Sequence, residues 1–356
     1  MNFSKEETLV VTEATKTLIV PKGIKKLVCS GIGLETLILN EGIVIVDCQN
    51  NKLTKLTVPN SVTRLYCFNN KLTELTVPDS VTDLYCSDNK LTELTVPGVT
   101  RLDCSYNHLT KLIVHNGVTD LDCSGNRLTI LIVPNSVTYL NCSDNKLTEL
   151  IVPNSVTRLY CSYNELSKLT VPNGVILLHC SCNHLTKLIV HNGVTDLYCY
   201  GNKLAKLTVP NGVIYLNCHS NVLTVLIVPN SVTHLYCFNN KLTELTVPDS
   251  VIRLHCSSNL LTELIVPNSV TCLNCYGNLL EDLREYSELI KPRVVSLYTM
   301  CYGIVNENNV PKFFSKVDKV TCDECGDKVI KDLAYILCKG NVEGYIRKTI
   351  ICKKCF

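Results

Sequence analysis

The stretch VTDLYCSDNKLTELTVPG, residues 81–98, contains the pattern that decides the fold of this chain. It reads V-T-x-L-x-C-x-x-N-x-L-T-x-L-x-V-P, and the same pattern recurs from about residue 20 to about residue 280. Its cysteine returns every 19 residues, with one spacing of 18 between Cys86 and Cys104. In that shorter unit Gly98 alone separates Pro97 from Val99, whereas the other units have two residues there. The positions of this cysteine are 29, 48, 67, 86, 104, 123, 142, 161, 180, 199, 218, 237, 256 and 275.

The first part of each unit predicts a short β-strand. Alternation in V-T-x-L-x-C puts the Leu and Cys side chains on one face of the strand and the intervening side chains on the other. The Asn that follows can supply two donors and an acceptor to backbone groups at the turn. Only about ten residues remain for the return, which suits an extended or turn-like segment better than a helix. We therefore predict a mainly β solenoid with one strand of a parallel sheet in each unit.

A single unit of this kind cannot fold alone, because its few apolar side chains do not offset the conformational entropy lost by its backbone. Stacked units share the missing contacts, and the two ends of the stack need caps. We expect an N-terminal cap at residues 1–19, the repeats at 20–280, a C-terminal cap and linker at 281–311, and a separate module at 312–356. Residues Leu280, Leu283, Tyr286 and Ile290 lie at helical spacing within the C-terminal cap.

The pattern V-x-x-L-x-C-x-x-N-x-L resembles the signature of the leucine-rich-repeat family, with Cys in the third apolar position. The resemblance covers roughly three quarters of the chain. The short period is most similar to the compact repeats of bacterial effector proteins and of repeat proteins encoded by giant viruses of amoebae. It implies about 14 repeats with the parallel sheet on a concave face.

The composition of the chain limits the classes of protein to which it can belong. The chain has 356 residues, 22 of them Cys, and a net charge of +2, which argues against a strongly basic nucleic-acid coat protein. It contains no apolar stretch of about 18 residues and no secretory leader pattern, so we expect no membrane span, reduced thiols and a cytoplasmic location, the host cytoplasm if the protein is viral. The 14 regularly spaced cysteines are expected to be core residues, since a free Cys packs as a small apolar group.

The outward positions of the strands carry the candidate binding residues. Tyr, Phe and Arg recur there although folding does not require them, and these are residue types that anchor protein interfaces. The candidates are Arg64, Tyr66, Phe68, Tyr85, Arg158, Tyr160, Tyr198, Tyr200, Tyr236, Phe238 and Arg253. Block duplication is the competing explanation, because residues 107–121 are identical to 183–197 and residues 65–81 to 235–251.

Two C-x-x-C pairs near the C-terminus resemble a zinc ribbon. Cys322, Cys325, Cys352 and Cys355 offer four thiolates, which complete a tetrahedral site for one structural zinc ion. A hairpin through Ile336 and Leu337, turning near Gly340, would bring the pairs together. Redox chemistry of the C-x-x-C pairs is the alternative, although no βαβ pattern surrounds them.

The sequence favours a non-catalytic scaffold that binds a protein partner on the concave face. The common nucleotide-binding, metalloprotease and hydrolase motifs are absent from it, so we predict no enzyme. Two alternatives stay open: substrate recognition for ubiquitin transfer, by analogy with bacterial effectors, and nucleic-acid binding through the zinc-ribbon-like module.

Overall fold

The computed structural model describes residues 4–280 in full and, beyond them, the backbone of short strands at 320–321, 328–329, 334–339 and 347–352. The chain divides into two units, residues 1–193 and 194–356. Strands and turns make up the described residues, and no helix among them is long and apolar enough to span a membrane.

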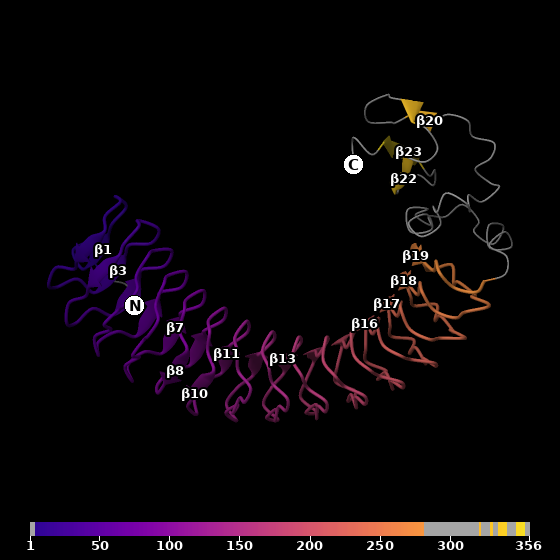
Figure 1. Ribbon diagram of the computed structural model, residues 1–356, viewed down its shortest axis with the longest axis horizontal. Helices are drawn as coiled ribbons and strands as arrows, with labels where there is room; N and C mark the ends of the chain where they lie inside the picture. The colour runs from indigo at the N-terminus through magenta and orange to yellow at the C-terminus, as the bar shows by residue number, and fades with distance from the viewer. Residues whose placement is uncertain (1–3, 281–319, 322–327, 330–333, 340–346, 353–356) are drawn as a thin grey trace. The chain divides into compact units, whose positions relative to one another are not determined.

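In the first unit, every turn contributes a three-residue strand to one parallel sheet, called the front sheet below (Figure 1). In order these strands are β1 (Thr8–Val10), β3 (Lys26–Val28), β5 (Ile45–Asp47), β6 (Arg64–Tyr66), β7 (Asp83–Tyr85), β9 (Arg101–Asp103), β11 (Asp120–Asp122), β12 (Tyr139–Asn141), β13 (Arg158–Tyr160) and β14 (Leu177–His179). Leu65 lies beside Leu84, and Leu84 lies beside Leu102. The 18-residue unit therefore keeps the register of the front sheet, because its missing residue is lost from a turn.

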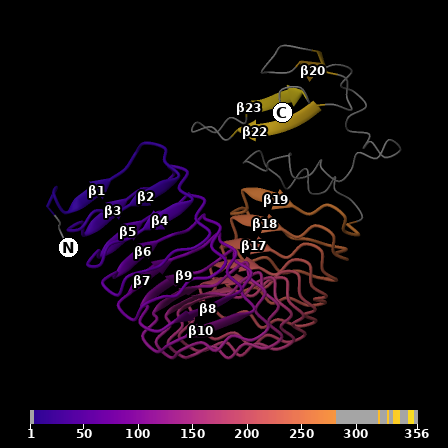
Figure 2. The same ribbon diagram turned by 60° about the vertical axis from the view of Figure 1, so that its left-hand side comes forward.

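The return segments of the first unit lie on the other side of each turn, as Figure 2 shows for β8 and β10. Two pairs of them form short parallel ladders: β2 (Thr17–Ile19) with β4 (Thr36–Ile38), and β8 (Glu93–Val96) with β10 (Lys111–Val114). Thr170 and Ile189 add an isolated parallel bridge. Extended return segments, predicted from the small number of residues available, are confirmed.

The second unit continues the same construction. Its front sheet contains β15 (Asp196–Tyr198), β16 (Tyr215–Asn217), β17 (His234–Tyr236), β18 (Arg253–His255) and β19 (Cys272–Asn274), all parallel. Further along the chain, β20 (Val320–Thr321) pairs antiparallel with β21 (Lys328–Val329). Another antiparallel pair joins β22 (Ala334–Lys339) to β23 (Arg347–Cys352), so the strands of the expected hairpin through Ile336 and Leu337 are present.

The core of both units consists of inward Leu, Val and Cys side chains. In a typical turn Leu121, Cys123 and Leu128 have no exposed surface. The 14 cysteines of the repeat are buried thiols outside any disulfide, as predicted from their spacing. Burial raises the pKa of most of them, for example that of Cys142 to about 12. Cys182 and Cys272, which fall outside the repeat, are half-buried.

A buried Asn links each turn to its neighbour. The amide nitrogen of Asn126 donates to the carbonyl oxygens of Cys104 at 3.1 Å and Cys123 at 3.0 Å. Its Oδ1 accepts from the backbone N–H of Leu109 at 2.9 Å. Most turns repeat this arrangement, for example at Asn70 and Asn145. The Asn side chain therefore satisfies backbone groups exposed where the chain leaves the sheet, as the sequence predicted.

One expectation about the strand surface was wrong. Phe68, Tyr200 and Phe238, counted above among the outward positions, each follow a repeat cysteine, but Ser87, Ser105 and Ser257 are buried at the same position of their units. The chain begins its inward turn at this position, so the small side chains of Ser87 and Ser105 are covered, whereas the larger ring of Phe68 is half-buried. The expected helical cap and linker at 281–311 lie outside the described residues. At the N-terminal end, β1 belongs to the front sheet and β2 pairs with the return strand β4, so residues 8–19 already have the construction of the repeats.

Candidate binding face

The outward side of the front sheet, called the front face, carries all of the residues that the sequence singled out for binding. The middle residue of each front strand from β3 onward is buried, Val46 in β5 and Leu in the others, so the residues on either side of it point outward. Arg64, Arg158 and Arg253 are exposed. The aromatic candidates are half-buried, namely Tyr66, Phe68, Tyr85, Tyr160, Tyr198, Tyr200, Tyr236 and Phe238. All of these side chains reach the surface, and their role in binding remains a prediction.

The first part of the front face combines stacked phenol rings with neutralised charge. Tyr66 and Tyr85 are stacked with ring centroids 5.0 Å apart and planes 8° from parallel. Beside them, Asp83 lies between two arginines, 3.6 Å from Arg64 Nε and 3.7 Å from Arg101 Nη1. Burial and the neighbouring Tyr66 and Asp83 raise the pKa of Tyr85, so its hydroxyl stays protonated.

The next strands carry carboxylates. Asp103 Oδ1 accepts from Ser105 Oγ at 2.7 Å, and Asp122 Oδ1 accepts from Ser124 Oγ at 2.6 Å. Asp103 and Asp122 are register neighbours on β9 and β11, and such an arrangement of like charges is unfavourable. Burial, followed by the field of Asp122, raises the pKa of Tyr139 to about 12. This part of the face is therefore electronegative.

Aromatic rings return on β12 to β14. The ring of Tyr160 lies between Tyr139, at a centroid distance of 5.7 Å, and His179, at 4.8 Å. The exposed Arg158 side chain lies on the same strand as Tyr160. This region therefore offers both apolar ring surface and a guanidinium group for hydrogen bonding.

The second unit has a larger aromatic cluster on its front face. One column stacks Tyr200, His219 and Phe238 at centroid distances of 4.4 and 4.0 Å. A second column places Tyr215 against Tyr198 at 4.9 Å and Tyr236 at 5.4 Å. His255 joins the columns, because it contacts Phe238 at 4.3 Å and Tyr236 at 6.2 Å. The cluster thus presents a continuous, ordered aromatic surface.

Two histidines are held neutral inside this cluster. Burial lowers the pKa of His219 to about 4, and His255 adds to the effect. Burial also lowers the pKa of His255, which contacts the amide nitrogen of Asn274 through Nε2 at 2.6 Å. Near neutral pH both rings are therefore uncharged and stack as aromatic groups.

The prediction from sequence did not include Tyr215, His219 and His255 among the binding candidates. Their positions in the repeat were a sufficient signal, since each occupies an outward position of its strand or the position after a repeat cysteine. What the sequence could not give is the ring stacking, which arises because parallel strands bring equivalent positions of successive turns side by side.

Three of the four predicted zinc ligands lie outside the described residues, so the structure does not bring the four together. Cys352 ends β23, opposite Ala334 in the register, whereas Cys322, Cys325 and Cys355 lie outside the described residues. Within the described part of the chain, no group of three or more His, Cys, Asp or Glu side chains is arranged to hold a metal ion. The zinc site stays a prediction.

Solved structures with the same architecture are leucine-rich-repeat proteins. YopM from Yersinia pestis, a leucine-rich effector protein, aligns with a TM-score of 0.68 and 26% identity over 78% of this chain and 84% of its own. YopM from Yersinia enterocolitica aligns with a TM-score of 0.67 and 24% identity over 72% of this chain and 65% of its own. The functional domain of InlJ from Listeria monocytogenes, which includes a cysteine ladder, aligns with a TM-score of 0.56 and 28% identity over 67% of this chain and 64% of its own.

Comparison by sequence adds no relative, since no family model and no curated protein matches the chain. In this chain, buried Leu, Cys and Asn positions account for the parallel ladder. The chain is therefore a mainly β, parallel-strand solenoid of about 14 turns with the fold of leucine-rich-repeat proteins.

Proposed function

We propose that this protein is a non-catalytic scaffold that binds a protein partner on the front face. The observation that carries the proposal is the stacked aromatic surface of the second unit, where Tyr198 and Tyr236 stack on Tyr215, and Tyr200 and Phe238 stack on His219. Rings that are already ordered lose little conformational entropy on binding, and Tyr and Arg dominate the energetics of protein interfaces. The YopM and InlJ structures support a scaffold of this type.

The test compares two double variants in the full chain. Tyr236→Ala with Phe238→Ala removes front-face rings, and Glu244→Ala with Thr246→Ala removes exposed side chains from a return segment of the same unit. Circular dichroism checks that both variants fold. In affinity capture with quantitative mass spectrometry, the first variant should lose a partner at least about tenfold, as expected for interface anchors. Equal capture by both variants and the wild type would refute the front face as the binding surface.

We also propose that Cys322, Cys325, Cys352 and Cys355 bind one structural zinc ion. The antiparallel pair β22 and β23 supports this, because a hairpin of this kind connects the two C-x-x-C pairs of a ribbon. Metal analysis of the purified protein should give one zinc per chain, and Cys352→Ser with Cys355→Ser should abolish it. Retention of zinc by the double variant would exclude these ligands.

We also propose that the protein is located in the cytoplasm. Buried free thiols in every repeat suit a reducing compartment, where disulfides are rare. In a host cell, imaging of the tagged full chain should show it in the cytoplasm, and a secreted product would refute this location.

A further inference from the structure

The return side of the first unit, formed by its return segments, carries exposed isoleucines on three neighbouring turns. They occupy positions beside a buried Leu, as Ile130 and Ile132 do on either side of Leu131. The exposed fractions are 40% for Ile113, 70% for Ile130, 79% for Ile132 and 85% for Ile151. Folding does not require isoleucine there, since an earlier turn has Glu93 and Thr95 at these positions. Contiguous exposed apolar side chains mark an interaction surface.

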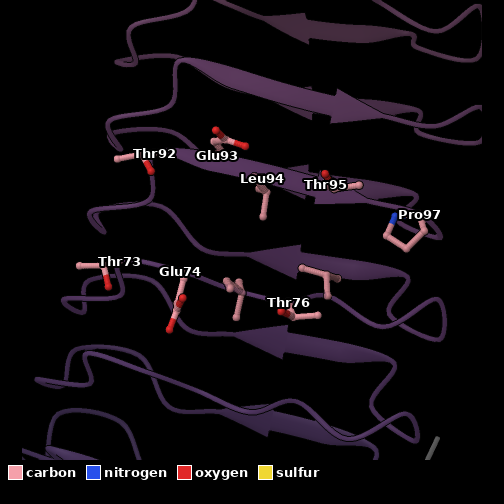
Figure 3. A pocket seen from close by; sticks show the side chains of 10 residues that line it. Thr73, Glu74, Thr76, Thr92, Glu93, Leu94, Thr95 and Pro97 are labelled. Atoms are coloured by element: carbon pink, nitrogen blue, oxygen red, sulfur yellow. The ribbon is translucent and has the colours of Figure 1, made fainter.

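Equivalent residues of neighbouring return segments lie side by side. In the ladder of β8 and β10, Glu93 lies beside Lys111 and Thr95 lies beside Ile113. Figure 3 shows the same order one turn earlier, where Glu74 is in line with Glu93. The following turns keep this register through repeated backbone hydrogen bonds, from Arg127 N–H to Leu109 O, from Lys146 N–H to Leu128 O and from Glu165 N–H to Leu147 O. The outward residues of the return segments therefore form columns that run from turn to turn.

The column that contains Ile130 has opposite charges on its two sides. In chain order this first column reads Glu74, Glu93, Lys111, Ile130, Glu149, Lys168 and Lys187, and its charged members are all exposed. At one, two and three turns from Ile130, the residues on the two sides are Lys111 and Glu149, Glu93 and Lys168, and Glu74 and Lys187. Reversing the order of the turns therefore exchanges every charge for one of opposite sign.

The column that contains Ile132 is symmetric about the same turn. This second column reads Thr95, Ile113, Ile132, Ile151 and Thr170. Reversing the order of the turns exchanges Ile with Ile and Thr with Thr. A surface on which reversal keeps the apolar residues and inverts the charges is complementary to a second copy of itself turned end to end. The two columns together therefore favour the chain itself as the occupant.

We infer that the return side of the first unit binds a second copy of this chain, through a two-fold axis that runs along the return segment of Ile130 and Ile132. Ile132 then meets Ile132 of the second copy, and Ile113 meets the second copy's Ile151. Lys111 pairs with Glu149 of the second copy, and the symmetry repeats each of these contacts. This surface uses none of the front-face residues, so the inference is independent of the scaffold function proposed above.

The charges fix which turn lies on the axis. An axis on the turn of Lys111 would place this Lys against its own copy and Glu74 against Glu149. An axis on the turn of Glu149 would place this Glu against its own copy and Lys111 against Lys187. Like charges disfavour both arrangements, and an axis on the uncharged Ile130 avoids them. At the start of that segment Arg127 would face its own copy, so the contact is confined to the two columns.

The second unit supplies a matched comparison. Val225 likewise has a Lys one turn before it and a Glu one turn after it in its column. Its neighbour Ile227 is 79% exposed, as Ile132 is. However, Ile227 lies between Thr208 and Thr246 in its column, where Ile132 has an isoleucine on each side. The charges next to the central residue are therefore the same in the two units, and the adjacent isoleucines distinguish the first.

Sedimentation velocity of the purified full chain, at concentrations from about 1 to about 300 µM, tests the inference. The wild type should form a dimer as the concentration rises. Ile132→Lys places two like charges on the axis and should raise the Kd of dimerisation at least about tenfold. Ile227→Lys replaces an equally exposed isoleucine of the second unit and should change the Kd less than about twofold. Circular dichroism checks that both variants fold.

Charge exchange tests the two-fold axis itself. Lys111→Glu and Glu149→Lys each bring like charges together between the copies, so each should raise the Kd at least about fivefold. Combining the two substitutions restores opposite charges, so the double variant should dimerise within about twofold of the wild type. The proposal is overturned if the full chain stays monomeric, if Ile132→Lys and Ile227→Lys have equal effects, or if the double variant dimerises no better than the single variants.

Discussion

Replacing Asn126 with Ala tests the interaction that joins one turn to the next. The side chain is 9% exposed and makes contacts with four backbone groups: it accepts from Leu109 N–H at 2.9 Å and donates to the carbonyls of Cys104, Cys123 and Ser124 at 3.1, 3.0 and 3.2 Å. An amide group has two donor hydrogens, so two of the three donations and the one acceptance count as full bonds.

The expected loss follows from these contacts. Each hydrogen bond contributes about 1 kcal/mol net, and the buried Leu109 N–H left without an acceptor adds about 1–2 kcal/mol. Asn126→Ala should therefore lower the free energy of unfolding by about 4–5 kcal/mol. The exposed Asn116→Ala is the control and should change it by less than about 0.5 kcal/mol.

The assay is urea unfolding followed by circular dichroism, with hydrogen exchange at the Leu109 amide as a local readout. Asn126→Asp refines the test, since it keeps an acceptor for Leu109 but replaces the donors with a carboxylate facing three carbonyls. Burial and these carbonyls should raise the pKa of that carboxyl in the folded state, so this variant should gain stability as the pH falls. A cost for Asn126→Ala equal to that of Asn116→Ala would refute the role assigned to the buried Asn.

Three further predictions concern the backbone and the aromatic cluster. Gly98→Ala should lower the free energy of unfolding in urea by about 2–3 kcal/mol, because the added carbon meets the Asp79 carbonyl. Gly193→Ala is the control and should cost less, since the nearest atom lies 3.3 Å from its added carbon. Equal costs would contradict the close approach at Gly98. Ser258→Gly should stabilise the protein by about 1 kcal/mol, since residue 258 has a left-handed φ of 53°, and a loss of stability would argue against this strain. Burial lowers the pKa of His219 in the folded state, so the stability linked to it is present above the unfolded value of 6.5 and is lost as the pH falls through 6.5 toward about 4. His219→Phe should reduce the drop in melting temperature between pH 7 and pH 5, and an unchanged drop would refute the assignment.

The front face could be predicted from the repeat in part. Strand alternation was sufficient to place Arg64, Tyr66 and Tyr160 outward, because a three-residue strand with a buried central Leu leaves its neighbours no other side. The same reasoning failed at Ser87, where the backbone has already begun to turn and a small side chain is covered. The alternation of inward and outward side chains holds only within a strand, and Ser87 lies in the turn that follows β7.

By itself the sequence determined the repeat, the parallel solenoid, the buried cysteines and the role of the Asn side chains, because each depends on the local pattern of apolar and polar positions recurring at a fixed period. Only the tertiary structure decided which rings stack, such as His219 between Tyr200 and Phe238, and which charges meet, such as Asp83 with Arg64 and Arg101. It also decided that the residue missing beside Gly98 leaves the front sheet in register and brings Gly98 against the carbonyl oxygen of Asp79. These features depend on distances between neighbouring turns, which the order of residues within one turn does not contain.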